Sequence, residues 1–226
     1  GTETGVFVSF NDGRQWLPLQ NNLPEVPITD LRVKRKDLVV ATQGRSLWIL
    51  DDLTPLHEIS QKVAEADYYL YKPRETSTEL SIAYSADEGF GENPPSGVQI
   101  NYVLNKAIDQ DLPMSIEIMD ETGKVIHSEY SNKPKTECDA YLRPQLKRSV
   151  GAHRYQWNMK IGRYDCIKEL VATSRNLSAY DATPGNYKVK LKIGGFEQIQ
   201  DFVISIDPRL LNSIPNVAEA YIERYQ

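Results

Sequence analysis

The residues that could carry out chemistry in this chain are few and scattered. Its three histidines, His57, His127 and His153, lie in different predicted elements, and none has a metal-ligating partner at i+2 or i+4. A zinc site needs three or four converging ligands, and the G-x-S-x-G elbow of many serine hydrolases does not occur. The sequence therefore predicts no metal, no cofactor and no catalytic residue, and it favours a chain that is not an enzyme.

Acidic pairs are the remaining candidates for hydrolysis or calcium binding: Asp51-Asp52, Asp87-Glu88, and Asp109 with Asp111. A glycosidase needs two carboxyl groups that flank a cleft, whereas the first pair follows a predicted strand and the second lies in a glycine-rich loop. The third pair is a poor calcium cage without further oxygen ligands. We expect the first pair to shape a turn or cap a helix, and the second to be solvated.

Aromatic side chains offer a different chemistry, because their rings can stack on sugars. Tyr68, Tyr69 and Tyr71 follow one another along an extended segment. Alternate residues of a strand point to opposite faces, so at least one of these rings is predicted to be exposed and able to stack on a glycan. The three tryptophans are predicted to pack in hydrophobic cores: Trp16, Trp48 and Trp157.

The two cysteines, Cys138 and Cys166, both lie in segments predicted to be long loops. Two cysteines are too few for a disulfide framework and lack the spacing of metal ligands. They are either two free thiols or, in an oxidising compartment, one disulfide that joins two loops.

The composition is that of a folded globular protein. The chain has 226 residues, of which 40% are hydrophobic and 25% charged, with a net charge of −5. This balance argues against a general nucleic-acid binder, whose surface would be basic, and no apolar run approaches the roughly 20 residues of a membrane span. The chain opens without methionine, inside a strand-like alternation, which indicates a piece of a longer polypeptide.

The hydrophobic periodicity predicts β-structure throughout. Short strands separated by turns fill residues 5–50, and a second β domain begins near residue 78. In its clearest strand, four apolar residues at 187–193 alternate with three lysines, so one face meets a core and the other meets water. About seven strands in roughly 130 residues predict an immunoglobulin-like or fibronectin-III-like sandwich.

One local motif is sharper. The octapeptide Ser-Phe-Asn-Asp-Gly-Arg-Gln-Trp at 9–16 resembles the Asp-box hairpin of β-propellers, Ser-x-Asp-x-Gly-x-Thr-Trp, through Ser9, Gly13 and Trp16. Asn11 replaces the usual aspartate, and its short polar side chain can accept hydrogen bonds from turn amides. Glycine supplies the backbone conformation of the turn, and tryptophan packs the hairpin. The motif is predicted to be structural.

The order of motifs along the chain resembles the C-terminal part of bacterial sortilin-like, or BNR-repeat, propeller proteins, which are often labelled glycosyl-hydrolase-like. The motifs are the Asp-box, the segment from Asp30 to Leu56, Thr183-Pro184-Gly185-Asn186-Tyr187 and Ile206-Asp207-Pro208-Arg209. A propeller blade needs roughly 40–45 residues, so about one blade fits. The resemblance implies a mainly β chain divided as follows: 1–53, a partial propeller of one final blade; 54–77, a linker with a short helix starting at Thr54-Pro55; 78–208, an Ig-like β-sandwich; and 209–226, a helical tail.

The resemblance also implies a role. It suggests a non-catalytic C-terminal scaffold or interaction module of a larger exported protein, periplasmic or extracellular, whose partners are the remaining blades of the parent chain. The alternative is a carbohydrate-binding accessory region of a glycosyl-hydrolase-like protein. An isolated blade should expose strand edges and apolar faces, so we expect it to dock on the sandwich or on a second copy of the chain. A monodisperse monomer with fifty flexible N-terminal residues would contradict this docking.

Overall fold

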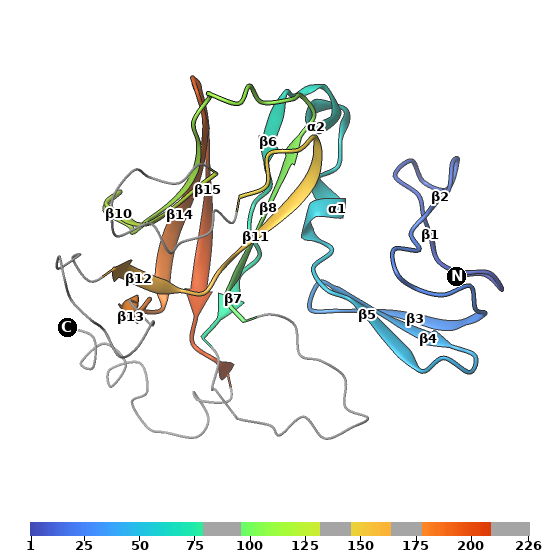
Figure 1. Cartoon of the computed structure of the whole chain (residues 1–226). Coiled ribbons are helices and arrows are strands. Elements are labelled where there is room, and N and C mark those ends of the chain that lie inside the picture. The colour runs from blue at the N-terminus through green and yellow to red at the C-terminus, as the bar shows by residue number, and fades with distance from the viewer. Residues whose placement is uncertain (79–95, 132–145, 164–177, 209–226) are drawn as a thin grey trace, which may run out of the picture. The chain divides into compact units, whose positions relative to one another are not determined.

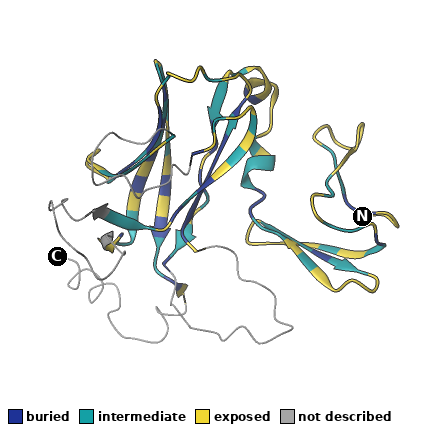
Figure 2. Cartoon of the chain, in the orientation of Figure 1, coloured by how far each residue is buried: buried dark blue, intermediate teal, exposed yellow. Residues whose placement is uncertain are grey.

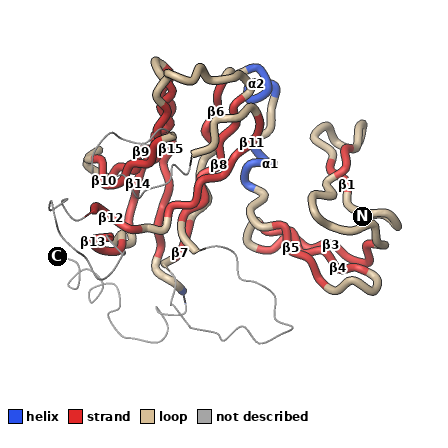
Figure 3. Tube along the Cα trace, in the orientation of Figure 1, coloured by secondary structure: helices blue, strands red, loops and turns tan. Residues whose placement is uncertain are grey.

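The computed structural model describes residues 1–78, 96–131, 146–163 and 178–208. The chain divides into two compact units, Gly1–Ala64 and Glu65–Gln226. Strands dominate the described residues of both units, with two helices of five residues each (Figure 3). The predicted mainly β fold class is therefore confirmed.

The first unit contains two small antiparallel sheets. Strands β1 and β2 form a hairpin, and the other three strands form a sheet in the order β3-β4-β5 (Figure 1). Their bounds, with those of the two helices, are β1 Phe7–Val8, β2 Leu17–Pro18, β3 Ile28–Lys34, β4 Asp37–Thr42, β5 Leu47–Leu50, α1 Thr54–Glu58 and α2 Gln61–Glu65. Arg35 and Lys36 join β3 to β4 with φ values of 49° and 69°, as a two-residue hairpin turn with left-handed backbone requires.

The second unit is built from a five-stranded sheet in the order β10-β9-β14-β15-β7 and a three-stranded sheet in the order β11-β8-β6. All of these pairings are antiparallel except that of β7 with β15. The strand bounds are β6 Tyr68–Leu70, β7 Thr76–Ser77, β8 Val98–Leu104, β9 Met114–Met119, β10 Val125–Tyr130, β11 Gly151–Trp157, β14 Gly185–Ile193 and β15 Phe196–Ser205. A separate pair consists of β12 (Lys160–Arg163) and β13 (Ser178–Asp181).

One hydrophobic core lies between these two sheets. Alternate residues of β8 in one sheet and of β9 and β14 in the other are fully buried (Figure 2), as the period of two in the sequence predicts. At its centre Trp157, from β11, contacts the rings of Tyr187 and Phe202, from β14 and β15, at centroid distances of 6.2 Å. The two sheets therefore form a sandwich joined by an aromatic cluster.

The strand order is that of an immunoglobulin-like sandwich. In chain order, β6, β8 and β11 correspond to strands A, B and E of one sheet, and β9, β14 and β15 to strands C, F and G of the other. The hydroxyl of Tyr187, near the start of β14, donates a hydrogen bond of 2.6 Å to the carbonyl oxygen of Thr183. A tyrosine bonded to the backbone a few residues upstream at this corner is a hallmark of such sandwiches.

Two features of the strand pattern differ from the sequence expectation. The segment 54–77, expected to be a linker, contributes β6 and β7 to the two sheets, and β12 and β13 lie on either side of Cys166, which is expected in a long loop. These four strands have two to four residues each, too few for a period of two to show. The predicted helical tail at 209–226 lies outside the described residues.

The edge of the three-stranded sheet at β6 is closed by side chains of the other sheet. Gln198 of β15 accepts a hydrogen bond from the N–H of Leu70 (2.9 Å) and donates one to its carbonyl oxygen (3.0 Å). Gln200 donates a second to the same oxygen at 3.0 Å. Side-chain amides thus supply the bonds that a neighbouring strand would make, and buried backbone groups need such partners.

A second clamp joins Tyr102 of β8 to the segment that leads into β11. The Tyr102 hydroxyl donates to the carbonyl oxygen of Lys147 (2.9 Å) and accepts from its N–H (3.0 Å). The side chain is 1% exposed, and burial raises the pKa of Tyr102 to about 12. Because burial disfavours the ionised form of Tyr102 in the folded state, the free energy of unfolding depends on pH in the alkaline range.

We expect the contribution of Tyr102 to stability to be complete below pH 10 and to fall as the pH rises from 10 to 12. Unfolded tyrosine ionises near pH 10 and folded Tyr102 near 12, a difference of about 3 kcal/mol. Urea unfolding of the wild type and of Tyr102→Phe should therefore show a stability gap of about 1–2 kcal/mol at pH 8, from the lost hydrogen bonds, that narrows above pH 10. A gap independent of pH would contradict the prediction.

Candidate functional site

The hairpin that carries the Asp-box-like octapeptide is held by its own polar side chains. Asn11 Oδ1 accepts the backbone N–H of Gln15 at 2.9 Å, and Ser9 Oγ accepts that of Gly13 at 2.8 Å. Gly13 has a φ of 82°, which a residue with a Cβ adopts only at a cost. The third position of the motif thus accepts a turn amide, which is the role that the sequence assigns to it.

Trp16 departs from the expectation of core packing. Its side chain lies near Gly13, where a Cβ would be 3.7 Å from the indole, but the residue is 60% exposed. Trp48 is half-buried, with its indole N–H donated to the carbonyl oxygen of Arg45, and Trp157 is fully buried. The core prediction is therefore wrong for Trp16, because in the first unit this ring covers its own turn and is not enclosed by a second layer.

The three-stranded sheet β3-β4-β5 presents one face that we call the open face. Its register places Asp30 beside Ala41 and Ala41 beside Leu47, in a first row across the strands. In the next row, Arg32 lies beside Val39 and Val39 beside Ile49. Residues two apart on a strand share a face, so the open face includes these two rows: Asp30, Ala41 and Leu47; Arg32, Val39 and Ile49.

The apolar part of the open face is exposed. Leu47 is 69% and Ile49 60% exposed, whereas side chains of this kind are usually buried. The opposite face of the sheet is also apolar, and it includes the buried Val40 and the 66% exposed Val33. A sheet with a single covered face alternates apolar with polar residues, so this sheet has the composition of one that packs on both sides.

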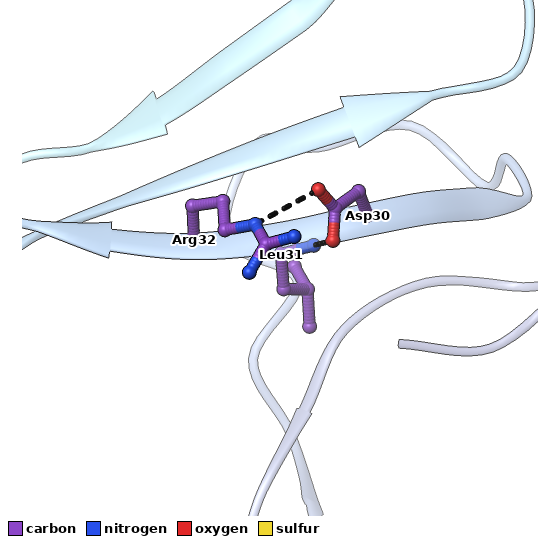
Figure 4. Close-up of polar contacts among 3 residues, drawn as sticks. All are labelled: Asp30, Leu31 and Arg32. Carbon is purple, nitrogen blue, oxygen red and sulfur yellow. Dashed lines mark hydrogen bonds and ion pairs between the residues drawn. The ribbon is translucent and has the colours of Figure 1, made fainter.

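The charged part of the open face is balanced. Asp30 accepts the backbone N–H of Leu31 at 2.9 Å and pairs with the Nε of Arg32 at 3.1 Å (Figure 4). Closer to the turn, Lys34 and Asp37 lie opposite each other on the same face. Two acidic and two basic side chains leave this face without net charge.

The tyrosines expected to stack on glycans are divided between the two faces of the other unit's three-stranded sheet. Tyr68 points inward and packs edge-on against Phe196 at 5.5 Å. Tyr69 and Tyr71 lie on the outer face, edge-on to each other at 5.2 Å, but Tyr71 is only 7% exposed. Tyr68 and Tyr69 are both half-buried, so each of these two rings keeps some accessible surface.

His127 and Asp52 each form a hydrogen bond within their own unit. His127 forms a 2.8 Å hydrogen bond with the Tyr155 hydroxyl, which joins β10 to β11 across the sandwich. Asp52 accepts the N–H of Thr54, two residues further on, in a turn before α1, which is the turn-shaping role expected of its pair. In the part of the chain that the structure describes, no three side chains among His, Cys, Asp and Glu gather as metal ligands. Cys138, Cys166 and Asp87-Glu88 lie outside the described residues.

Comparisons with known proteins find no similar protein. The chain matches no family model, no curated protein and no solved structure. Across the described residues, no helix combines the length and the apolar character needed to cross a membrane. The exposed apolar sheet β3-β4-β5 of the first unit is thus the candidate functional site.

Proposed function

We propose that this chain is a non-catalytic interaction module, the C-terminal part of a larger exported propeller protein, and that its first unit docks against other β-sheets of the parent chain. The observation that carries the proposal is the exposure of large aliphatic side chains on both faces of β3-β4-β5: Val33 on one face, Leu47 and Ile49 on the other. A contiguous apolar patch on a folded protein marks a binding surface.

The free energy of burying these side chains favours docking over exposure to solvent. Full burial of one aliphatic side chain contributes about 1.5–3 kcal/mol, and three such side chains are more than half exposed here. Propeller blades are small antiparallel sheets arranged around an axis, so each blade packs on both faces. The hydrogen-bonded hairpin at 9–16, which resembles an Asp-box, is a further feature that favours this architecture.

The proposal is tested by supplying the expected neighbours. The polypeptide that precedes Gly1 in the parent chain, produced separately, is expected to bind this chain with a dissociation constant of about 1 µM or lower. Because both faces are used, Val33→Lys and Leu47→Lys should each weaken binding at least about tenfold, since each places a charge in an apolar contact. Isothermal titration calorimetry measures the affinity.

A matched control is available on the second unit. Val203, on the solvent side of β15, is 40% exposed, and Val203→Lys should leave the affinity unchanged. Absence of binding by the wild-type chain, or an equal loss in all three variants, would contradict the proposed function.

A further inference from the structure

The open face of β3-β4-β5 is complementary to itself. Its first row reads Asp30, Ala41, Leu47 and its second row reads Arg32, Val39, Ile49, strand for strand. A two-fold axis that crosses the strands between the two rows would lay the first row of one copy on the second row of another. We propose that two copies of this chain associate face to face in this way.

Each facing pair in this arrangement is chemically matched. Asp30 of one copy faces Arg32 of the other, so the two Asp30–Arg32 pairs, each 3.1 Å long within one chain, join into a network of four charges. The small Ala41 faces the larger Val39, and Leu47 faces Ile49. Layers that alternate small and large side chains interdigitate, and a two-fold interface requires this reciprocity.

The balance of charges on the open face also favours a second copy of the chain over a strongly charged partner. With Asp30 and Asp37 set against Arg32 and Lys34, a strongly acidic or basic partner gains no net attraction. In the two-fold arrangement, by contrast, Asp30 of each copy faces Arg32 of the other. The opposite face lacks this pattern, because its residues on the three strands are apolar: Leu31, Val33, Leu38, Val40, Trp48 and Leu50.

The expected association is weak. With strands about 4.8 Å apart and a rise of about 3.3 Å per residue, the face measures roughly 15 Å in each direction. The area of the face is therefore roughly 200 Å², well below the roughly 800 Å² per partner of a standard stable interface. We expect a dissociation constant on the order of 10–100 µM, with dimers that form and dissociate readily.

Sedimentation equilibrium of the full chain between about 1 and 500 µM tests the proposal, with concentrations chosen to bracket this constant. The wild type should pass from monomer to dimer, and Leu47→Lys should remain monomeric at every concentration. Val33→Lys, equally exposed but on the opposite face, should dimerise as the wild type does. A wild type that stays monomeric, or dimers lost in Val33→Lys and kept in Leu47→Lys, would overturn the inference.

Charge reversal tests the two-fold arrangement itself. Asp30→Arg places two basic residues in the charged pair, and Arg32→Asp places two acidic ones, so each variant alone should repel its own copy. Mixed in equal amounts, the two variants should form a heterodimer, because an acidic face then meets a basic one. If the mixture stays monomeric while the wild type dimerises, the proposed register is wrong.

This inference rests on the proposed function, since a second copy occupies the open face of the same sheet where the preceding polypeptide is absent, but the two can fail separately. Docking to the preceding polypeptide requires Val33 as well as Leu47, whereas the dimer requires only the open face. Binding of that polypeptide by a chain that does not dimerise would overturn the dimer alone. A dimer without that binding would overturn the proposed function and leave the self-association as the use of this face.

Discussion

Trp157→Ala is expected to lower the free energy of unfolding of the second unit by about 3–5 kcal/mol. Trp157 is fully buried, and its ring joins the two sheets through Tyr187 and Phe202 at 6.2 Å. Its indole N–H also donates to the carbonyl oxygen of Lys160 at 3.1 Å. Truncation removes the ring contacts and leaves a cavity between sheets that cannot close completely. Urea unfolding monitored by circular dichroism measures the change.

The same substitution at Trp16 is the control. That side chain is 60% exposed, and surface changes are usually worth less than about 0.5 kcal/mol. Equal destabilisation by Trp16→Ala and Trp157→Ala would show that the aromatic cluster does not hold the sandwich together.

Gly97→Ala is expected to cost about 3 kcal/mol or more. Gly97 precedes β8 with a φ of 104°, and a Cβ there would lie 2.2 Å from the carbonyl oxygen of Trp157. The position of that Cβ is fixed by the backbone next to β8 and the oxygen belongs to the backbone of β11, so no rotamer change relieves the clash and the β8–β11 pairing must shift. Loss of a buried, well-packed arrangement of this kind belongs among the largest effects of single substitutions.

Gly123→Ala separates the clash from the backbone conformation. Gly123 has a φ of 85°, but a Cβ there would meet nothing within 4 Å. This variant should therefore lose only about 1–2 kcal/mol, the cost of a left-handed residue with a Cβ. Thermal unfolding of both variants measures the difference, and comparable losses would contradict a steric origin at Gly97.

Periodicity carried most of the sandwich prediction. The alternation at 187–193 predicts β14, and its four apolar residues lie in the core while Lys190 pairs with Glu117 of β9 at 2.6 Å on the outer face. The segment Glu-Thr-Gly-Lys at 121–124, which is typical of a hairpin turn, joins β9 to β10, with the carboxylate of Asp120 accepting the N–H groups of Thr122 and Lys124 at 3.0 Å. Both patterns are local, so the sequence alone is sufficient to predict them.

Features that depend on a partner layer could not be predicted. The type of a residue does not say whether a neighbouring sheet is present, and so Trp16 was expected in a core although it is exposed. The three tyrosines at 68, 69 and 71 likewise indicate alternation, but which ring faces the core depends on the pairing of Tyr68 with Leu104. The open face required the register of three strands, which places residues from 30 to 49 in two rows.

The hydrogen bonds of Gln198 and Gln200 with the backbone of Leu70 affect how copies of this chain can associate. Unpaired strand edges invite strand addition from other chains, which is a common route to fibres. Because Gln198 and Gln200 already occupy the N–H and carbonyl groups of Leu70, an incoming peptide would have to displace three hydrogen bonds to extend the sheet there. These hydrogen bonds thus protect this edge of the sandwich against open-ended polymerisation, whereas the face-to-face contact proposed for the first unit closes after two copies.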